Sequence, residues 1–270
     1  MSLAVLVMMD GLRPDPLREY ESRFPNLTAV RRRSAWTLNG SSIMPTVTLP
    51  CHMCIFHSVP PSRHGVSRNQ WVPMQDPLPG LVEVAHEAGQ QTAMFYSWEK
   101  LRDVTRPGNL SYAFFTDEKY DLPHGDVTVL EEALRFLSRP QTGFIFVYFG
   151  SVDTAGEEHG WMTERYLAQV EIVDNLLGRL LAALPADAAI LVQADHGGHD
   201  YDHGTDLPED MTIPWMVAGP EIKQNYEIQT QVTLLDTAPT LAHILGFESH
   251  PQWQGRCIEE IFEPQKEARL

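Results

Sequence analysis

The chain has 270 residues, of which 43% are hydrophobic and 21% charged, and its 36 acidic side chains against 20 Lys and Arg give a formal net charge of −16. This apolar content excludes a disordered chain, and the longest apolar stretch, from Leu3 to Met9, is too short to cross a bilayer. The acidic balance argues against a protein that binds nucleic-acid polymers, but not against a small phosphate ligand, because bound cations can reverse the local potential.

The first apolar run is not preceded by the basic residues of a signal peptide, so we expect residues 3–9 to form a strand. The three cysteines, Cys51, Cys54 and Cys257, have no disulfide spacing. We interpret the Cys51–Cys54 pair as small buried side chains, because no second pair lies at the spacing of a zinc site. These features predict a cytoplasmic protein that does not associate with a membrane.

Apolar runs alternate with amphipathic stretches along the chain. The runs that we expect to form strands are 3–9, 91–96, 143–149, 188–193 and 213–218, and the expected helices are 26–34, 79–88, 127–138, 163–184 and 236–245. Unbroken apolar strands suit a parallel sheet that is covered on both faces. The sequence therefore predicts one α/β domain over residues 1–270, a doubly wound and mostly parallel sheet sandwiched by helices.

Acidic residues follow three of the expected strands. Asp10, Asp153 and Asp195 lie at strand ends, and His196 directly follows the last of them. Ligands of open parallel sheets bind beyond the carboxyl ends of the strands, so this set predicts a divalent metal site. Thr48 begins a further expected helix through 51–57, where the helix dipole favours an ionised hydroxyl. Together these groups match the needs of two-metal phosphoryl transfer.

Several ordered motifs carry a resemblance to a known group of enzymes. They are Asp-Gly-Leu-Arg-Pro-Asp at 10–15, Thr-Leu-Pro-x-His at 48–52, Arg-His-Gly-Val at 63–66 with Asn69, Asp-x-x-Gly at 153–156, Ala-Asp-His-Gly-Gly at 194–198, His-Gly-Thr at 203–205, Asp-Thr-Ala-Pro-Thr at 236–240 and Gly-Arg at 255–256. This series resembles the alkaline phosphatase superfamily, and within it the nucleotide pyrophosphatase/phosphodiesterase (type I phosphodiesterase) branch. The motifs follow the family's order and span nearly the whole chain.

The resemblance implies an alkaline phosphatase-like fold with two divalent metal ions, for which Zn²⁺ is the first expectation. One ion would be held by Asp10, Thr48, Asp195 and His196, with Thr48 as the nucleophile, and the second by Asp153, Glu157 and His203. Asn69 would donate its side-chain amide to a phosphoryl oxygen, as would the backbone amide of Thr48 at the helix start.

One position departs from the family pattern. Where the family has a His four residues after the first Asp of the second metal site, this chain has Glu157. Glutamate can ligate zinc through oxygen, and we prefer it to His159, which could substitute by a shift of the loop. The added carboxylate favours Mn²⁺ or another oxygen-preferring ion relative to zinc.

Other residues near these motifs are assigned structural roles. We expect His52 to pack or to orient its helix, and His199 to lie in a loop or behind a ligand. Trp98 and Trp161 follow strand ends and could stack on a base, although core positions are the more common role of such residues.

The expected function is hydrolysis of a small phosphodiester or nucleotide pyrophosphate through a covalent phosphothreonine. A phosphomonoesterase or a phosphonate hydrolase of the same superfamily, and a metal-free binding module, are the alternatives. A sulfatase is not expected, because residues 51–55 lack the Cys/Ser-x-Pro-x-Arg motif, and neither the serine nor the large inserted domain of a phosphoglycerate mutase is evident. The segment from Asn69 to Asp153 leaves little room for a cap, which predicts a small phosphate-ester substrate. The sequence leaves the oligomeric state open.

Overall fold

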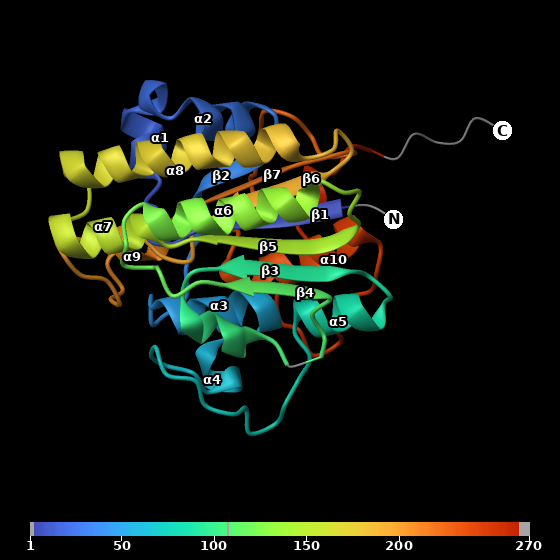
Figure 1. The fold of residues 1–270 in the computed structure, drawn as a ribbon. Helices are drawn as coiled ribbons and strands as arrows, with labels where there is room; N and C mark the ends of the chain where they lie inside the picture. Colours follow the sequence, from blue (N-terminus) through green and yellow to red (C-terminus); the bar gives the residue numbers. More distant parts are fainter. Residues whose placement is uncertain (1–2, 107, 265–270) are drawn as a thin grey trace.

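The computed structural model describes residues 3–106 and 108–264, and in this part of the chain a mixed sheet lies between two layers of helices (Figure 1). The strands are β1 (Leu3–Met9), β2 (Ala35–Ser41), β3 (Thr92–Tyr96), β4 (Tyr112–Phe115), β5 (Gly143–Phe149), β6 (Ala189–Gln193), β7 (Thr212–Ala218) and β8 (Tyr226–Glu227). The described strands form one eight-stranded sheet in the order β4-β3-β5-β1-β6-β7-β2-β8. Only β7 is antiparallel to its neighbours.

The centre of the sheet brings the ends of three strands to one edge. Every residue of β1, β5 and β6 is buried, as expected for parallel strands covered on both faces. β1 and β5 pair without a shift from Leu3 opposite Gly143 to Met9 opposite Phe149. The residues that follow these strands therefore start level with one another at the carboxyl edge.

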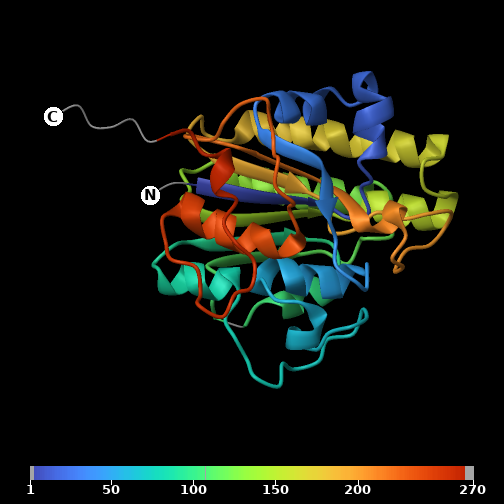
Figure 2. The same ribbon diagram turned by 180° about the vertical axis from the view of Figure 1, so that it is seen from behind.

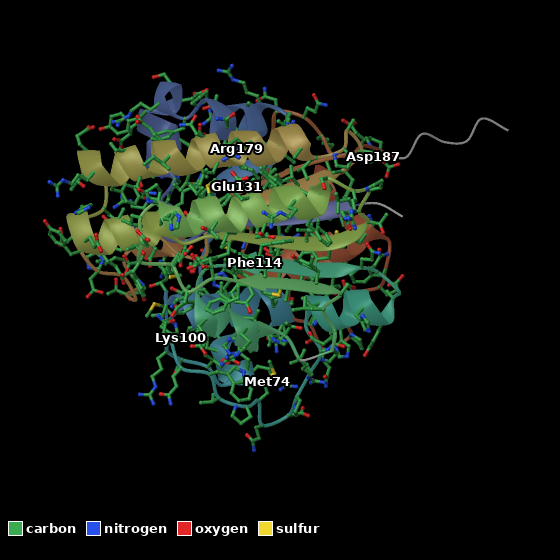
Figure 3. The ribbon with its side chains drawn as sticks, in the orientation of Figure 1. Met74, Lys100, Phe114, Glu131, Arg179 and Asp187 are labelled. Carbon is green, nitrogen blue, oxygen red and sulfur yellow. The ribbon has the colours of Figure 1, made fainter. Side chains whose placement is uncertain are left out.

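Helices cover both faces of the sheet. On one face lie α1 (Asp15–Glu19), α2 (Pro25–Arg32), α6 (His124–Leu137), α7 (Ser151–His159) and α8 (Glu164–Ala183), and on the other α3 (Thr48–His57), α4 (Pro61–His64), α5 (Leu81–Glu87) and α10 (Thr237–Leu245). Figure 2 shows α10 and α3 from behind. The shorter elements are α9 (Pro208–Met211) and the 3₁₀ helices η1 (Glu21–Arg23), η2 (Glu99–Val104), η3 (Leu234–Asp236) and η4 (Glu259–Ile261). On the outer surface Arg179 of α8 pairs with Glu131 of α6 (Figure 3).

The predicted α/β sandwich is confirmed, and each predicted strand and helix is present with ends shifted by at most a few residues. The sequence did not predict β2, β4, β8 or α7. β2 contains polar residues and carries a register shift between Thr37 and Gly40, so it is not an unbroken apolar run. β4 is apolar, but it is a mostly exposed edge strand of only four residues. Among the described residues, no helix combines the length and apolarity that crossing a bilayer requires.

Candidate metal centre

Three buried carboxylates meet at the carboxyl edge of the sheet. Asp10 directly follows β1, Asp153 lies in the first turn of α7 after β5, and Asp195 lies two residues beyond β6. All three are at most 1% exposed. The parallel pairing of β1 with β5 and β6 explains why residues far apart in the sequence converge here.

The side chains form two groups that could each hold a metal ion. One group is Asp10, Asp195 and His196, and the other is Asp153, His196 and His203; within each group the ligand atoms all lie within 4.8 Å of one another. The division expected from the sequence is close to this one, except that His196 belongs to both groups and Glu157 to neither. The two candidate sites are therefore adjacent.

Hydrogen bonds to backbone carbonyl groups fix the orientation of the two histidine rings and place a proton on each Nδ1. Nδ1 of His196 lies 2.8 Å from the carbonyl oxygen of Gly197, and Nδ1 of His203 lies 2.8 Å from that of Thr46. Because a carbonyl oxygen only accepts, Nδ1 must be the donor in both rings. This arrangement directs each Nε2 toward the carboxylates, and backbone bonds of this kind commonly orient metal-binding imidazoles.

Three carboxylate oxygens in this centre lack a hydrogen-bond partner among the described residues. They are Oδ1 of Asp10, Oδ1 of Asp153 and Oδ2 of Asp195, all buried. A buried anionic oxygen without a partner is costly, and coordination to a cation removes that cost. The donor set, with three orphaned oxygens and two oriented imidazoles, therefore fits divalent ions.

Burial and mutual charge shift the protonation of these groups. Burial lowers the pKa of His196 to about 3, which keeps the ring neutral as metal ligation requires. Burial also raises the pKa of Asp153 to about 6 and that of Asp195 well above its usual range. For His203 burial lowers the pKa, but the neighbouring Glu157 and Asp153 outweigh it and raise the pKa to about 9.

Lys119 also belongs to the centre, although no sequence motif marks it. It lies in the loop between β4 and α6, and its Nζ is 2.8 Å from Oδ2 of Asp153 and 3.4 Å from Oδ2 of Asp10. Tyr148 donates a hydrogen bond to the same oxygen of Asp10. Burial raises the pKa of Asp10, but Lys119 and the nearby histidines outweigh this effect and lower it below its usual range.

Thr48 and Asn69 lie together at the amino end of α3. Thr48 is 1% exposed, and its Oγ1 lies 3.4 Å from Nε2 of His196. Oδ1 of Asn69 accepts a hydrogen bond of 2.9 Å from the backbone N–H of Leu49, so this side chain is fixed against the first turn. His52, one turn further, donates Nδ1–H to the Thr48 carbonyl at 2.8 Å and lies 3.5 Å from Oδ2 of Asp195. Its place beside a candidate ligand goes beyond the packing role expected from the sequence.

Glu157 lies at the border of the second group. Its Oε1 is 3.6 Å from Nε2 of His203, and its side chain is 43% exposed. His159 instead lies 3.8 Å from Glu158, the acidic residue that it pairs with in the described structure. Glu157 thus contacts a candidate ligand of the second group, and its preference over His159 as a ligand stays a prediction.

The remaining candidates have structural positions. Trp161 is 6% exposed and donates Nε1–H to the carbonyl of Gly11, and His199 bonds Asp210 through Nδ1 at 2.8 Å. Trp98 is also 6% exposed, and the ammonium group of Lys119 lies 5.1 Å from its ring centre. Neither tryptophan offers an open face for stacking on a base.

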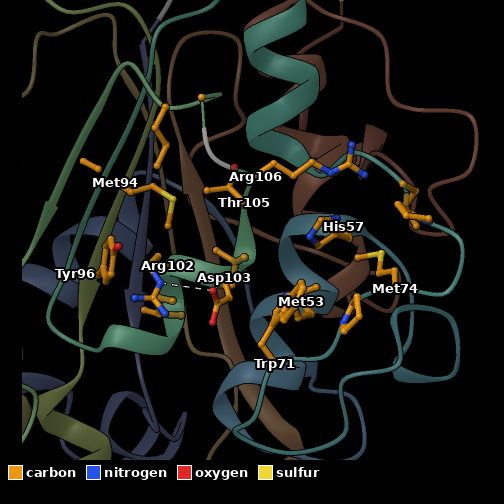
Figure 4. A pocket seen from close by; sticks show the side chains of 18 residues that line it. Met53, His57, Trp71, Met74, Met94, Tyr96, Arg102, Asp103, Thr105 and Arg106 are labelled. Carbon is orange, nitrogen blue, oxygen red and sulfur yellow. Dashed lines mark ion pairs between the residues drawn. The ribbon is translucent and has the colours of Figure 1, made fainter.

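The described part of the chain also contains a cavity of about 660 Å³ (Figure 4). Its walls come from α3, β3, η2 and the segment 71–78, and they are mostly apolar, with Met53, Trp71, Met94 and Tyr96 among the lining residues. Arg102 and Asp103 form an ion pair on the wall in Figure 4. The lining residues include none of the candidate metal ligands in the described part of the chain, so the cavity is separate from the two candidate sites.

A mostly parallel sheet between helices, with paired His/Asp sites at its carboxyl edge, defines an alkaline phosphatase-like protein, and structural similarity shows the same fold. The chain belongs to the type I phosphodiesterase/nucleotide pyrophosphatase family, whose model matches residues 4–217. Enzymes of this family hydrolyse phosphodiesters.

Two solved structures illustrate the similarity of the fold. A 2-O GAG sulfatase superposes with a TM-score of 0.82 at 17% identity, covering 98% of this chain and 75% of that protein. An inactive threonine-to-alanine variant of murine ectonucleotide pyrophosphatase/phosphodiesterase 5, in complex with AMP, gives a TM-score of 0.81 at 13% identity, covering 97% of this chain and 100% of that one.

Curated relatives are larger proteins. A phosphopentomutase of Herpetosiphon aurantiacus is 28% identical over 172 residues, which cover 63% of this chain and 40% of the relative. The chain thus spans well under half the length of the curated relatives that it matches first.

Proposed function

We propose that this protein is a metal-dependent phosphohydrolase that cleaves a small phosphodiester or nucleotide pyrophosphate through a covalent phosphothreonine at Thr48. The observation that carries this proposal is the buried Thr48 hydroxyl, at the amino end of α3 and 3.4 Å from Nε2 of His196. His196 belongs to both candidate metal sites, so this hydroxyl is next to both. The inactivity of the threonine-to-alanine variant of the murine structural neighbour supports the same assignment.

The proposed ligand sets draw on the two groups and add Thr48 to the first and Glu157 to the second. Asp10, Thr48, Asp195 and His196 would hold one ion, and Asp153, Glu157 and His203 the second. Divalent ions bound there would lower the pKa of the Thr48 hydroxyl and polarise the phosphoryl oxygens. We propose Zn²⁺ as the native ion, with Mn²⁺ as the alternative because carboxylates outnumber imidazoles in this set.

The protein's own groups position the reacting atoms. The Thr48 oxygen attacks phosphorus as the ester bond to the leaving oxygen breaks, and water then cleaves the phosphothreonine. The backbone N–H of Thr48, at the start of α3, can donate to a phosphoryl oxygen. Asn69 accepts a hydrogen bond from Leu49 through Oδ1, which leaves its amide group to donate to the same oxygen.

Metal analysis and a substrate series test this proposal. We expect two ions per chain after reconstitution with Zn²⁺ or Mn²⁺, and faster hydrolysis of bis-(p-nitrophenyl) phosphate than of p-nitrophenyl phosphate or p-nitrophenyl sulfate. A higher rate with the monoester, or with a phosphonate monoester, would select one of the alternative reactions. Bound metal near zero would instead favour a binding module without catalysis.

Two substitutions separate the nucleophile from the metal site. Thr48→Ala should abolish turnover and leave metal content nearly intact, because the carboxylates and imidazoles remain. Thr48→Ser is the matched control, since it keeps the hydroxyl and should keep measurable turnover. Turnover of Thr48→Ala at the wild-type level would refute the assignment of Thr48 as the nucleophile.

A further inference from the structure

We propose that Lys119 is a positioning residue shared by both candidate metal sites: its ammonium group holds the outer carboxylate oxygens of Asp10 and Asp153, so that their inner oxygens face the ions. This inference rests on the proposed two-metal function. Neither the sequence motifs nor the family match assigns a role to this lysine.

Lys119 binds one oxygen of each carboxylate and leaves the other free. Its Nζ contacts Oδ2 of Asp153 and Oδ2 of Asp10, at 2.8 and 3.4 Å. The Oδ1 atoms of both residues are buried and have no hydrogen-bond partner among the described residues. The ammonium group therefore lies on the outer side of the two carboxylates.

The free oxygens point toward the candidate ligands of each site. Oδ1 of Asp10 is 3.3 Å from Nε2 of His196, and Oδ1 of Asp153 is 3.8 Å from Nε2 of His203. A quarter turn of either carboxylate about its Cβ–Cγ bond would break the contact with Lys119, whereas a half turn only exchanges two equivalent oxygens. A cation fixed on the outer side thus holds each carboxylate in the plane that presents its other oxygen to an ion.

The lysine is itself held in place on three sides. Its backbone N–H donates to the carbonyl of Ser97 at 3.1 Å, and its carbonyl accepts from Oγ1 of Thr154 at 3.4 Å. The Trp98 ring lies 5.1 Å from Nζ, within the range of a cation–π contact. The side chain is 4% exposed, so Nζ has little freedom to move away from the two carboxylates.

Charge balance gives Lys119 a second effect. Glu157 stands where the family pattern has a neutral imidazole, and it adds one negative charge beside Asp153. Lys119 places one positive charge beside the same aspartate. Removing the partner of a buried charge is strongly destabilising, so the metal-free centre should depend on Lys119 more than the metal-loaded centre does.

Lys119→Met tests the inference, with calorimetric titration of Zn²⁺ and of Mn²⁺ into the metal-free protein as the readout. We expect affinity for both ions to fall by about tenfold or more, the usual effect of losing a group that orients metal ligands. The Tm of the metal-free variant should fall, and turnover should recover at saturating metal. Lys100→Met is the matched control, because Lys100 contacts the same Trp98 ring at 5.2 Å without an ion pair to a carboxylate in the described part of the chain.

The outcomes are distinct. Wild-type or tighter binding of both ions by Lys119→Met would overturn the inference. Such a result would mean that Lys119 neutralises the carboxylates of the metal-free protein and does not orient them for an ion. If that variant does not fold, Lys119→Arg decides: it keeps the charge but moves the donors, so we expect a folded protein with weaker binding of both ions, and wild-type affinity would overturn the inference. A wild-type protein that binds no ion would overturn the proposed function itself.

Discussion

The protonation of His203 predicts that binding of the second metal ion depends steeply on pH. The neighbouring Glu157 and Asp153 raise the pKa of His203 to about 9, so at pH 7 the ring of the metal-free protein is almost fully protonated. Its Nδ1 donates to the Thr46 carbonyl, so the proton that an ion must displace is the one on Nε2. In the metal-free protein, the stabilisation from this charged ring is complete below about pH 6.5 and is lost as the pH rises through about 9.

The free-energy cost of removing the Nε2 proton of His203 follows from its raised pKa. Two pH units separate the pKa of about 9 from pH 7, which corresponds to about 2.7 kcal/mol, or roughly a hundredfold in apparent affinity. We expect affinity for the second ion to rise by about tenfold per pH unit between pH 6 and 8, with at least one proton released per chain. Titration calorimetry in buffers of different ionisation enthalpy measures both quantities.

Glu157→Gln is the informative variant for this prediction. It removes the carboxylate beside Nε2 of His203, so the pKa of the ring should fall and fewer protons should be released at pH 7. His199→Asn is the control, because His199 pairs with Asp210 and belongs to neither candidate site. Affinity for the second ion that does not change between pH 6 and 8 would refute the reasoning.

Three further predictions concern packing and charges at residues that are not metal ligands. Gly198→Ala should destabilise the protein by about 1–3 kcal/mol in urea unfolding, because the new Cβ would lie 2.3 Å from the Trp161 ring; an unchanged midpoint would contradict this. Asp126→Asn should destabilise the protein by about 1–3 kcal/mol in urea unfolding. The backbone N–H groups of Gly150 and Ser151 donate to different oxygens of the buried carboxylate, and an amide would place an NH2 group against one of these donors. Burial raises the pKa of Asp126 to about 6, so its contribution to stability falls as the pH rises from about 4 to 6, and thermal melts of the variant should lack this slope. Hydrogen bonds to Glu260 outweigh burial and lower its pKa to about 2, so Glu260→Gln should remove stability that the native protein has above about pH 4.5 and loses on acidification toward pH 2; identical acid unfolding of both proteins would refute it.

Local sequence patterns were enough to predict some residues of the candidate site, but not all of them. Asp10, Asp153 and Asp195 could be singled out because each follows an apolar strand, and the parallel pairing then brings them together. Lys119 could not, since it lies in a loop whose path to the site depends on contacts with Ser97 and Thr154. The assignment of the three aspartates as metal ligands stays a prediction, which metal analysis tests.

The fold, too, was predicted in part from the sequence. Unbroken apolar runs with helical stretches between them were enough to predict the central strands and the covering helices. The edge strands β4 and β8 are too short for a clear signal, at four and two residues, and β2 is interrupted by polar residues and a register shift. The antiparallel direction of β7 could not be predicted from its composition, because β7 is nearly as apolar as the central parallel strands.

The sequence by itself determined the class of fold and the residue types available for metal binding, because burial on both faces demands continuous apolar strands and ligands require acids and histidines. Only the tertiary structure decided which atoms meet. His196 belongs to both groups, one oxygen each of Asp10 and Asp153 is free, and the buried Lys119 contacts the other oxygen of each. These choices depend on side-chain orientation within a packed core, where each rotamer is set by neighbours from distant parts of the chain. A linear pattern carries no information about such contacts.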